Sequence, residues 1–406
     1  MQFLKLRLRI YLCSGTSEEK GHLRLCSPYK KFSWDAILLR LYCQCDRCVD
    51  KICLSSLNED TFVQSVKLDT APTDNDLLVE IGNDIFDKHV TKISLTWLRL
   101  NCYCDLCLNN AIAERQTSFV DPQISFIPSV EYSRIVDDRD AGLFEVAERV
   151  MKVGFCVIKD TPTVEETVIK VAEMFAPVHE TVTNKMFNVR IQPGPRNTAH
   201  TALGLCYHQD LPWYETEPGV QFLHALKFDE DIEGGESQFV DLFQVAEILR
   251  KEDPEAFNDL ARIPATYETI DYIRAKPAHY ETLKPHIELD YFGNVVALHW
   301  NPGVEGTLRA KGDDVKKYYR GYNKLLGIIR RKELEWAFRM DAGDIIVFNN
   351  HRMVHARKAY SSKENGQRHL QGCYISLDEF RSVYVTLGES LNREVPLFKV
   401  GNKSSF

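Results

Sequence analysis

Near the middle of the chain stands the stretch CYHQDLPW, residues 206–213. Its His208 and Asp210 are two residues apart, and on an extended strand such residues project to the same face about 6–7 Å apart. An imidazole and a carboxylate placed in this way can bind one metal ion. A His-x-Asp pair also arises by chance, so a metal site requires further candidate ligands elsewhere in the sequence.

A third candidate ligand follows a strongly apolar predicted strand in DIIVFNNHRMVHARKAY, residues 344–360. Both His351 and His355 lie in this segment. We favour His355, because its spacing to the arginine considered next is shorter. Two histidines and one carboxylate on one face of an ion leave the opposite positions open, which is the facial triad of non-haem Fe(II) oxygenases.

That arginine is Arg368, in QRHLQGCY, thirteen residues after His355. A strand, a turn and a returning strand would bring its guanidinium beside the metal. A fixed guanidinium can hold a carboxylate through two parallel hydrogen bonds, as a dicarboxylic co-substrate such as 2-oxoglutarate requires. Ser237, in GGES, could add a hydroxyl donor.

Around these residues the hydrophobic pattern is mostly strand-like. Alternation predicts a strand in VQFLHALKF (220–228), and HIELDYFGNVVALHW (286–300) predicts two strands around a Phe-Gly-Asn turn. Helical periodicity precedes these strands in 140–153 and 161–178 and interrupts them in 245–261 and 315–338. Many strands with helices at their side predict an α+β, mainly β protein, built on a β-barrel or double-sheet jelly roll with helical flanks.

Two of the predicted helices carry recognisable ends. Gly154 is placed to close the first, because glycine readily takes the left-handed conformation found just after a helix. Thr163 is placed to cap the second, with Glu166 at the capping-box position.

The bulk composition limits the possible partners. A chain of 406 residues with a net charge of −8 is too long for one core and is expected to form two domains. No apolar run approaches the roughly 20 residues that cross a membrane. Because no basic stripe stands out, we also expect no nucleic-acid partner.

The first 20 residues are expected to form a leader of uncertain structure. MQFLKLRLRIYLCSG contains Lys5, Arg7 and Arg9 and no acid, as a mitochondrial presequence would. The basic residues alternate with apolar ones at period two, which favours a strand. We therefore expect a cytoplasmic protein, with a mitochondrial location as the alternative.

Nine of the twelve cysteines lie between Cys13 and Cys107. With no secretory leader, such clustering favours metal over disulfides. The spacing C-x-C-x-x-C occurs twice, at Cys43, Cys45 and Cys48 and again at Cys102, Cys104 and Cys107. Either triad could fill three corners of a zinc tetrahedron, and the one histidine between them, His89, can complete only one. A polar segment follows, and we place the domain boundary near residue 125.

Five stretches together make the chain recognisable: YHQDLPW, PGVQFLHALK, GGESQFVDLF, DAGDIIVFNNHRMVHARKAY and RHLQGCY. They resemble the taurine dioxygenase-like family of Fe(II)- and 2-oxoglutarate-dependent enzymes, within it the branch that acts on gamma-butyrobetaine. Trimethyllysine dioxygenases share the same layout. The resemblance implies His208, Asp210 and His355 as iron ligands and Arg368 as the anchor of 2-oxoglutarate. It also implies a double-stranded β-helix core, a homodimer and ascorbate as reductant.

The same resemblance implies a choice between the cysteine triads. It assigns a structural zinc to Cys43, Cys45, Cys48 and His89, and it leaves Cys102, Cys104 and Cys107 as reduced, partly buried thiols or as an accessory cluster. The expected organisation is then a small zinc-binding β domain over 21–125, a dioxygenase domain over 126–395 and a tail over 396–406.

For the substrate, the resemblance implies a trimethylammonium group held by aromatic faces through cation–π attraction. Phe187 and Tyr374 fall on aromatic positions of this cage. Thr183 and His200 fall where the family also has aromatic residues, and a protonated His200 would repel a cation. Half of the expected cage is therefore changed in this sequence.

Asn197 and Asn301 match the residues that make polar contacts to the substrate carboxylate in the family. Leu211 stands where the family has a tyrosine. The implied reaction is the hydroxylation of gamma-butyrobetaine, with trimethyllysine or another small substrate as alternative. A dioxygenase that has lost this cage, a metallo-hydrolase using His208 and Asp210, and a non-enzymatic zinc module are further alternatives. The hydrolase would not explain the paired positions of His355 and Arg368.

Overall fold

The structure is a computed structural model of the chain. It describes residues 11–12, 22–27, 30–43, 60–68, 76–84, 88–102, 107–109, 119–191, 198–273, 277–362, 366–393 and 395. The chain divides into two compact units, residues 1–114 and 115–406. The domain limits expected near residues 20, 125 and 395 stay predictions.

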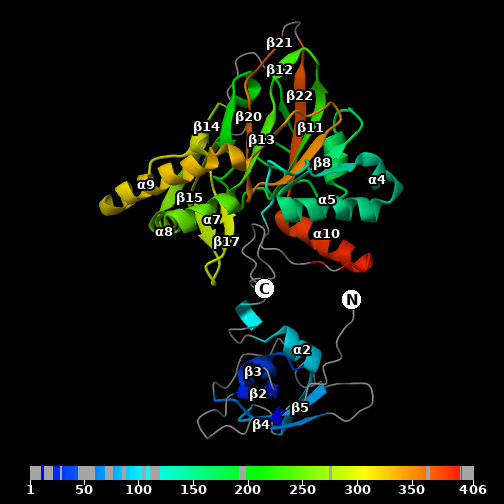
Figure 1. Cartoon of the computed structure of the whole chain (residues 1–406), viewed down its shortest axis with the longest axis vertical. Coiled ribbons are helices and arrows are strands. Elements are labelled where there is room, and N and C mark those ends of the chain that lie inside the picture. Colours follow the sequence, from blue (N-terminus) through cyan, green and yellow to red (C-terminus); the bar gives the residue numbers. More distant parts are fainter. Residues whose placement is uncertain are drawn as a thin grey trace. The chain divides into compact units, whose positions relative to one another are not determined.

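Two sheets form the centre of the larger unit (Figure 1). The strands of the first, in spatial order, are β7 (Ser129–Glu131), β8 (Phe155–Lys159), β19 (Ile345–Asn349), β11 (Val220–Phe228), β22 (Arg368–Ile375) and β9 (Phe187–Val189). Those of the second are β10 (Leu205–His208), β20 (Met353–Arg357), β13 (Ser237–Asp241) and β18 (Glu335–Phe338). All neighbouring pairs are antiparallel except β7 and β8.

The chain passes repeatedly from one sheet to the other. It goes from β10 to β11, from β11 to β13, from β19 to β20 and from β20 to β22. Apolar side chains from both sheets share one buried cluster, which includes Phe155, Phe348 and Leu370 of the first sheet and Phe239 and Met353 of the second. These alternating strands bring residues far apart in the sequence to one interior.

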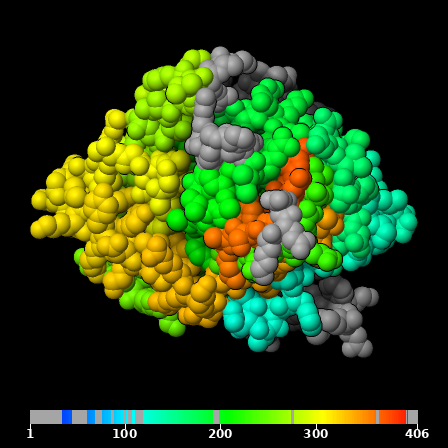
Figure 2. Space-filling model, turned by 90° about the horizontal axis from the view of Figure 1, so that it is seen from above, coloured from blue at the N-terminus to red at the C-terminus, as the bar shows by residue number. Residues whose placement is uncertain are grey.

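Helices cover the outer face of each sheet. α5 (Arg139–Val153), α6 (Thr167–Ala172) and α10 (Leu377–Ser390) pack on the first sheet, and α4 (Tyr132–Asp137) precedes α5. α7 (Leu242–Glu252), α8 (Pro254–Arg262) and α9 (Gly312–Ile329) pack on the second. Figure 2, seen from above, shows the yellow and orange residues around α9 on one flank and cyan-green residues on the other. The expected mixture of sheets with flanking helices is confirmed.

The remaining strands described in the larger unit form three two-stranded sheets. They are β12 (Ile232–Gly234), β14 (Pro264–Asp271), β15 (Ala278–Pro285), β16 (Ile287–Leu289), β17 (Val295–Leu298) and β21 (Tyr360–Ser362), and the 3-10 turns are η2 (Thr198–His200), η3 (Pro302–Val304) and η4 (Lys332–Leu334). The predicted turn between β16 and β17 is present, and Gly293 takes a φ of 77° there.

Helix α5 begins and ends where the sequence predicts. The Asp138 side chain accepts a hydrogen bond from the Ala141 backbone N–H at 3.2 Å, and Gly154 closes the helix with a φ of 100°. A Cβ at Gly154 would also lie 2.3 Å from the Met353 sulfur. Glycine is therefore required here both by conformation and by the close approach of β20.

Three predicted helices differ in the structure. Helix α6 begins only at Thr167, because Glu166 is left-handed with a φ of 65°, and Thr163 does not cap it. The segment 245–261 is divided between α7 and α8 at Pro254, whose ring cannot continue a helix. The segment 315–338 stops being helical at Ile329, since Trp336 is buried within strand β18.

Among its described residues, the smaller unit has two three-stranded sheets and short helices. Their bounds are β1 (Tyr11–Leu12), β2 (His22–Ser27), β3 (Lys30–Asp35), α1 (Ala36–Leu41), β4 (Phe62–Leu68), β5 (Asp76–Gly82), β6 (His89–Ser94) and α2 (Leu95–Leu100). Trp34, Leu39, Val79 and Leu98 share its buried core. Within the described residues of both units, no helix is long and apolar enough to cross a membrane.

Candidate active site

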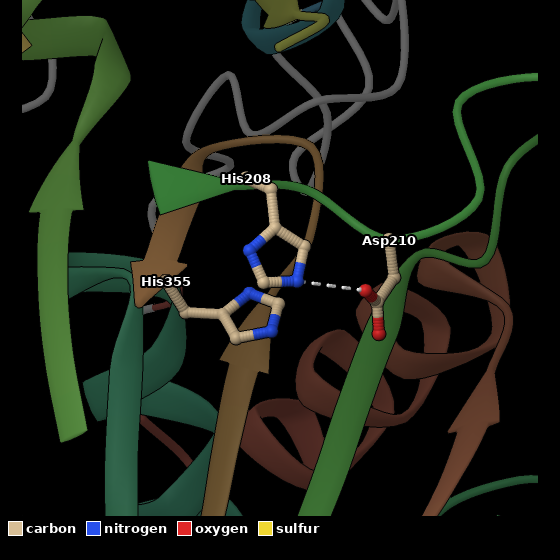
Figure 3. Close-up of side chains that lie close together, drawn as sticks. All are labelled: His208, Asp210 and His355. Atoms are coloured by element: carbon tan, nitrogen blue, oxygen red, sulfur yellow. Dashed lines mark ion pairs between the residues drawn. The ribbon is translucent and has the colours of Figure 1, made fainter. Parts of the chain in front are cut away.

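His208, Asp210 and His355 converge at one point of the larger unit (Figure 3). His208 ends β10, Asp210 follows in the next loop, and His355 lies within β20. One potential ligand atom from each side chain lies within 4.8 Å of the other two. His208 Nε2 is 3.4 Å from Asp210 Oδ1, and the His208 and His355 ring centroids are 4.2 Å apart. The structure thus brings together three residues separated by up to 147 positions.

Strand pairing and packing fix the two imidazoles. His355 lies opposite His208 on one side and opposite Phe239 of β13 on the other. Its ring centroid is 4.9 Å from that of Phe348. His208 Nδ1 is 2.8 Å from the Cys206 carbonyl oxygen, which can only accept a hydrogen bond. His208 therefore carries a proton on Nδ1 and directs Nε2, the atom suited to a metal, toward the other two residues.

The electrostatics of His355 and Asp210 suit a bound cation, whereas His208 would have to release a proton when a metal binds. Burial, together with the neighbouring His208, lowers the pKa of the His355 imidazole to about 3. Burial raises the pKa of the Asp210 carboxyl, but the hydrogen bond to His208 and the positive charges beside it lower that pKa well below its usual range. Burial lowers the pKa of His208, and Asp210 outweighs it and raises the pKa. A neutral imidazole and an ionised carboxylate are the forms that bind metals.

Amide side chains hold the loop that carries Asp210. Asn350 accepts a hydrogen bond from the Asp210 backbone N–H and donates one to its carbonyl oxygen, both at 2.9 Å. The Gln209 side chain accepts from the Trp300 backbone N–H at 2.9 Å. Sequence reasoning missed Gln209 and Asn350, because their partners are backbone groups distant in the sequence. The only signal was the position of Asn350 just after an apolar strand.

Arg368 is the first residue of β22 and is only 6% exposed. Its guanidinium carbon lies 5.1 Å from the Phe228 ring centroid and 5.7 Å from that of Tyr360. Within the described ranges, no hydrogen bond or ion pair reaches this guanidinium, and its Nε is buried. Burial and the nearby Arg357 lower the pKa of Arg368 to about 10. A buried, unpaired guanidinium is suited to a carboxylate from outside the chain.

Ser237 lies in strand β13 of the other sheet, two residues after Gly235, where a Cβ would lie 3.4 Å from Arg368 Nε. Ser237 stands opposite Arg357 in the pairing of β13 with β20. Arg357 is two residues after His355, so the two side chains project to the same face of β20. Arg357 donates hydrogen bonds to the backbone carbonyls of Thr201 and Leu203, at 2.7 and 2.6 Å. Arg357 therefore has partners within the chain, whereas Arg368 has none among the described residues.

Phe187 and Tyr374 lie together beside the triad. Their rings stack with centroids 5.2 Å apart, and the Tyr374 hydroxyl donates a 2.7 Å hydrogen bond to Asp210 Oδ2. Thr183 is exposed and its hydroxyl lies 2.8 Å from that of Thr181. His200 lies in η2 and is partly buried. No contact of Thr183 or His200 with the triad is found in the described part of the chain.

Of the two asparagines expected near a substrate carboxylate, one lies among the described residues. Asn197 lies outside the described residues. Asn301 donates to the Gln209 carbonyl oxygen at 2.9 Å and accepts from the Gly303 N–H at 3.1 Å, so it also helps to hold the His208–Asp210 loop. Leu211 is buried and takes a φ of 58°, a left-handed conformation unusual for leucine.

His351, the alternative to His355, lies elsewhere. Its Nε2 is 3.1 Å from the Glu217 carbonyl oxygen, so this nitrogen donates a proton rather than offering a lone pair. His351 lines a separate cavity of about 500 Å³, together with Glu217, Lys284 and His299. The described residues contain one other group with metal-binding spacing, Glu268, His279 and Glu281, but two of its members are exposed and Arg309 pairs with Glu281.

Two of the four residues expected to bind zinc lie together in the smaller unit. Cys43 Sγ lies 3.3 Å from His89 Nε2, and both side chains are buried. His89 Nδ1 contacts the Asp84 carboxylate, which Arg40 Nε also contacts at 2.7 Å. Metal-binding histidines commonly have such a carboxylate on their second nitrogen. Cys45 and Cys48 lie outside the described residues.

Two cysteines of the second triad are described. Cys102 is 7% exposed in the core of the smaller unit, and Cys107 packs against that core. Among the described residues, neither joins Cys43 and His89 in a group whose ligand atoms all lie within 4.8 Å. Cys104 lies outside the described residues.

Comparison with known proteins defines the class. The model of the taurine catabolism dioxygenase TauD, TfdA family matches residues 120–374, which include all three residues of the triad and Arg368. The chain belongs to this family. It is a 2-oxoglutarate-dependent dioxygenase that uses Fe(II), as the motifs led us to expect.

Individual proteins of known name are similar to most of the chain. The chain is 30% identical to the gamma-butyrobetaine dioxygenase of Pseudomonas sp. (strain AK-1) over 355 residues, 86% of this chain and 89% of that protein. It is 25% identical to the trimethyllysine dioxygenase of Meyerozyma guilliermondii over 368 residues, again 86% and 89%. A solved structure of asparagine oxygenase, in complex with Fe(II), hydroxyasparagine and succinate, aligns with a TM-score of 0.45 and 14% identity, covering 58% of this chain and 79% of that one.

Proposed function

We propose that this protein hydroxylates gamma-butyrobetaine to L-carnitine, with Fe(II) bound by His208, Asp210 and His355. The observation that carries the proposal is the convergence of these three side chains within 4.8 Å. Two imidazoles and a carboxylate are a donor set that suits Fe(II), and they leave other coordination positions open. The 30% identity to a gamma-butyrobetaine dioxygenase supports the substrate.

Residues around the triad bind the co-substrate. Arg368 binds the distal carboxylate of 2-oxoglutarate, since its guanidinium is buried and unpaired among the described residues. Ser237, opposite Arg357 in the strand pairing, adds a hydroxyl donor. Iron held there would supply the redox chemistry by which O₂ is consumed, one oxygen atom going to 2-oxoglutarate as it becomes succinate and CO₂ and the other to the hydroxylated substrate. The protein supplies the positions of both organic molecules and excludes water from them.

Phe187 and Tyr374 provide the aromatic faces for the trimethylammonium group. Each good cation–π contact contributes about 0.5–2 kcal/mol. Thr183 and His200 replace the other two aromatic residues of the expected cage, so binding should be roughly 10- to 1,000-fold weaker than with four faces. Asn197 and Asn301 are proposed to contact the substrate carboxylate. Trimethyllysine offers the same cation and is the second candidate, favoured by relatives of similar coverage.

A succinate-release assay tests the function. The purified chain, with Fe(II), 2-oxoglutarate and ascorbate, is given gamma-butyrobetaine, trimethyllysine or the unmethylated 4-aminobutyrate, and hydroxylated products are identified by mass spectrometry. We expect succinate and one hydroxylated product with gamma-butyrobetaine and none with 4-aminobutyrate. His355→Ala should abolish turnover, whereas His351→Ala, whose Nε2 donates to a carbonyl, should retain it. Turnover of trimethyllysine alone would replace the substrate and leave the reaction class intact.

The proposal extends to the fold, a structural metal and the state of the protein in the cell. We propose a double-stranded β-helix for the larger unit, based on its two facing sheets and alternating strands. For the smaller unit we propose a structural zinc bound by Cys43, Cys45, Cys48 and His89, supported by the contact of Cys43 with His89. A homodimer, a cytoplasmic location and ascorbate as reductant are proposed from the family resemblance alone.

A further inference from the structure

Tyr374 contacts both the expected substrate cage and an expected iron ligand. It is 4% exposed in β22, and its ring stacks on Phe187. Its hydroxyl donates a 2.7 Å hydrogen bond to Asp210 Oδ2. The other carboxylate oxygen, Oδ1, is the one that lies 3.4 Å from His208 Nε2. The two oxygens of Asp210 therefore have different partners.

We propose that the Tyr374 hydroxyl is a positioning group that makes Asp210 bind the metal through one oxygen only. Carboxylates bind metals through either one or two oxygens. A second bound oxygen would occupy one of the coordination positions that a facial triad leaves open. A hydrogen bond to Oδ2 stabilises the arrangement in which only Oδ1 faces the metal.

Because hydrogen bonds fix the backbone of Asp210, only its side chain remains free to rotate. Asn350 holds both the N–H and the carbonyl oxygen of Asp210 at 2.9 Å. Rotation of the carboxylate about its side-chain bonds could still exchange Oδ1 and Oδ2. Tyr374 is the residue whose hydroxyl opposes that rotation. Partners of this kind typically change metal affinity 10- to 100-fold when removed.

Two substitutions separate the hydroxyl of Tyr374 from its ring. Tyr374→Phe removes the hydrogen bond and keeps an aromatic face next to Phe187. Phe187→Leu removes an aromatic face and keeps the Tyr374 hydroxyl on Asp210. This inference rests on the iron site proposed above, so the two variants are compared first by metal binding and only then by turnover.

Anaerobic titration with Co(II), followed by visible absorption, measures the metal site without turnover. We expect Tyr374→Phe to weaken Co(II) binding about 10- to 100-fold and to alter the Co(II) spectrum. Its KM for gamma-butyrobetaine should rise less than that of Phe187→Leu, since an aromatic ring remains at position 374. Phe187→Leu should leave Co(II) affinity unchanged and raise that KM roughly 2- to 30-fold.

Unchanged Co(II) affinity and spectrum in a folded Tyr374→Phe variant would overturn the inference. If that variant does not fold, X-ray absorption of the wild-type Fe(II) protein decides, because one bound Asp210 oxygen is expected and two would overturn the proposal. The iron site itself would instead be overturned if the wild-type protein bound no metal, or if the His355→Ala variant bound it as tightly as the wild type. The two failures are therefore distinguishable.

Discussion

His208 and His355 stand directly opposite each other on the paired strands β10 and β20, with ring centroids 4.2 Å apart. The separation of the two candidate ligands is thus set by strand register rather than by a loop. Because side chains alternate along a strand, a slip by one residue would turn His355 to the outer face. A site built on paired strands is held more firmly than one built on loops.

The guanidinium of Arg368, which has no hydrogen-bond partner among the described residues, should affect activity and stability in opposite directions. Arg368→Met should raise the KM for 2-oxoglutarate by roughly 100-fold or more, because each lost charge-assisted hydrogen bond is worth about 1.5–3 kcal/mol. The same change removes a buried unpaired charge, so the protein without co-substrate should melt at a higher temperature. Steady-state kinetics and thermal unfolding measure the two effects.

Arg339→Met is the matched control for this prediction. The Arg339 guanidinium lies 3.8 Å from the Phe228 ring but donates to the backbone carbonyls of Ile232 and Asp229, both at 2.9 Å. Its loss leaves those carbonyls unpaired and should lower the melting temperature. If Arg368→Met destabilises the free protein as Arg339→Met does, Arg368 has a structural partner and the account of it is wrong.

Glu217 should be essential for stability although it is not a candidate ligand. It is 7% exposed, its Oε1 lies 2.6 Å from His299 Nδ1, and its other oxygen contacts Lys284. Glu217→Gln should cost about 3–5 kcal/mol of unfolding free energy at pH 7, since it leaves buried positive charge uncompensated. Urea unfolding measures this loss. The exposed neighbour Glu215→Gln should change it by less than about 0.5 kcal/mol.

The effect of Glu217 should depend on pH in a defined direction. Burial raises the pKa of Glu217, but His299, His351 and Lys284 outweigh it and lower the pKa well below the usual 4.5. The carboxylate therefore stabilises the fold above pH 4.5, and this contribution is lost as the pH falls below that value. The difference between wild type and Glu217→Gln should shrink in acid, and a constant difference would contradict the assignment.

Glu305 should show the reverse dependence. Burial raises its pKa from 4.5 to about 7, and its Oε1 has no hydrogen-bond partner among the described residues. The folded state then holds a proton that the unfolded state releases, so stability falls as the pH rises from about 4.5 to 7. Glu305→Gln should gain stability relative to wild type between pH 5 and pH 8. The exposed control Glu333→Gln should show no such trend.

The zinc assignment predicts different metal contents for two buried cysteines. Wild-type protein should retain about one zinc per chain after dialysis against a mild chelator. Cys43→Ser should lose it, because Cys43 contacts His89, while Cys102→Ser should keep it even if the core around Cys102 is weakened. Atomic absorption measures both. Zinc lost from Cys102→Ser and kept in Cys43→Ser would mean that the other triad binds the metal.

The sequence predicted the parts of the site that follow from spacing. His208 and Asp210 alternate on an extended segment, and an apolar strand leads to His355. The amides that hold Asp210 could not be predicted, since Asn350 and Gln209 bond to backbone groups that only the fold brings near. Nor could the contact of the Tyr374 hydroxyl with Asp210, because the sequence indicated only an aromatic ring at that position.

The predicted helices differ from the observed ones because of contacts between segments distant in the sequence. The Glu166 N–H donates to the Gln371 side chain of β22 at 2.8 Å, so this residue joins the sheet's outer face instead of a first helical turn. Helical periodicity after Ile329 gives way to a strand because Trp336 is buried opposite Phe239 of β13. Local propensity is a weak prior that such packing overrides.

The most direct test of the account is an anaerobic crystal structure with Mn(II) and 2-oxoglutarate, in which anomalous scattering locates the metal. We predict one strong anomalous peak in the larger unit, within bonding distance of His208 Nε2, Asp210 Oδ1 and His355. The distal carboxylate of 2-oxoglutarate should lie on the Arg368 guanidinium. A peak bound by other side chains, or 2-oxoglutarate bound away from Arg368, would contradict the account.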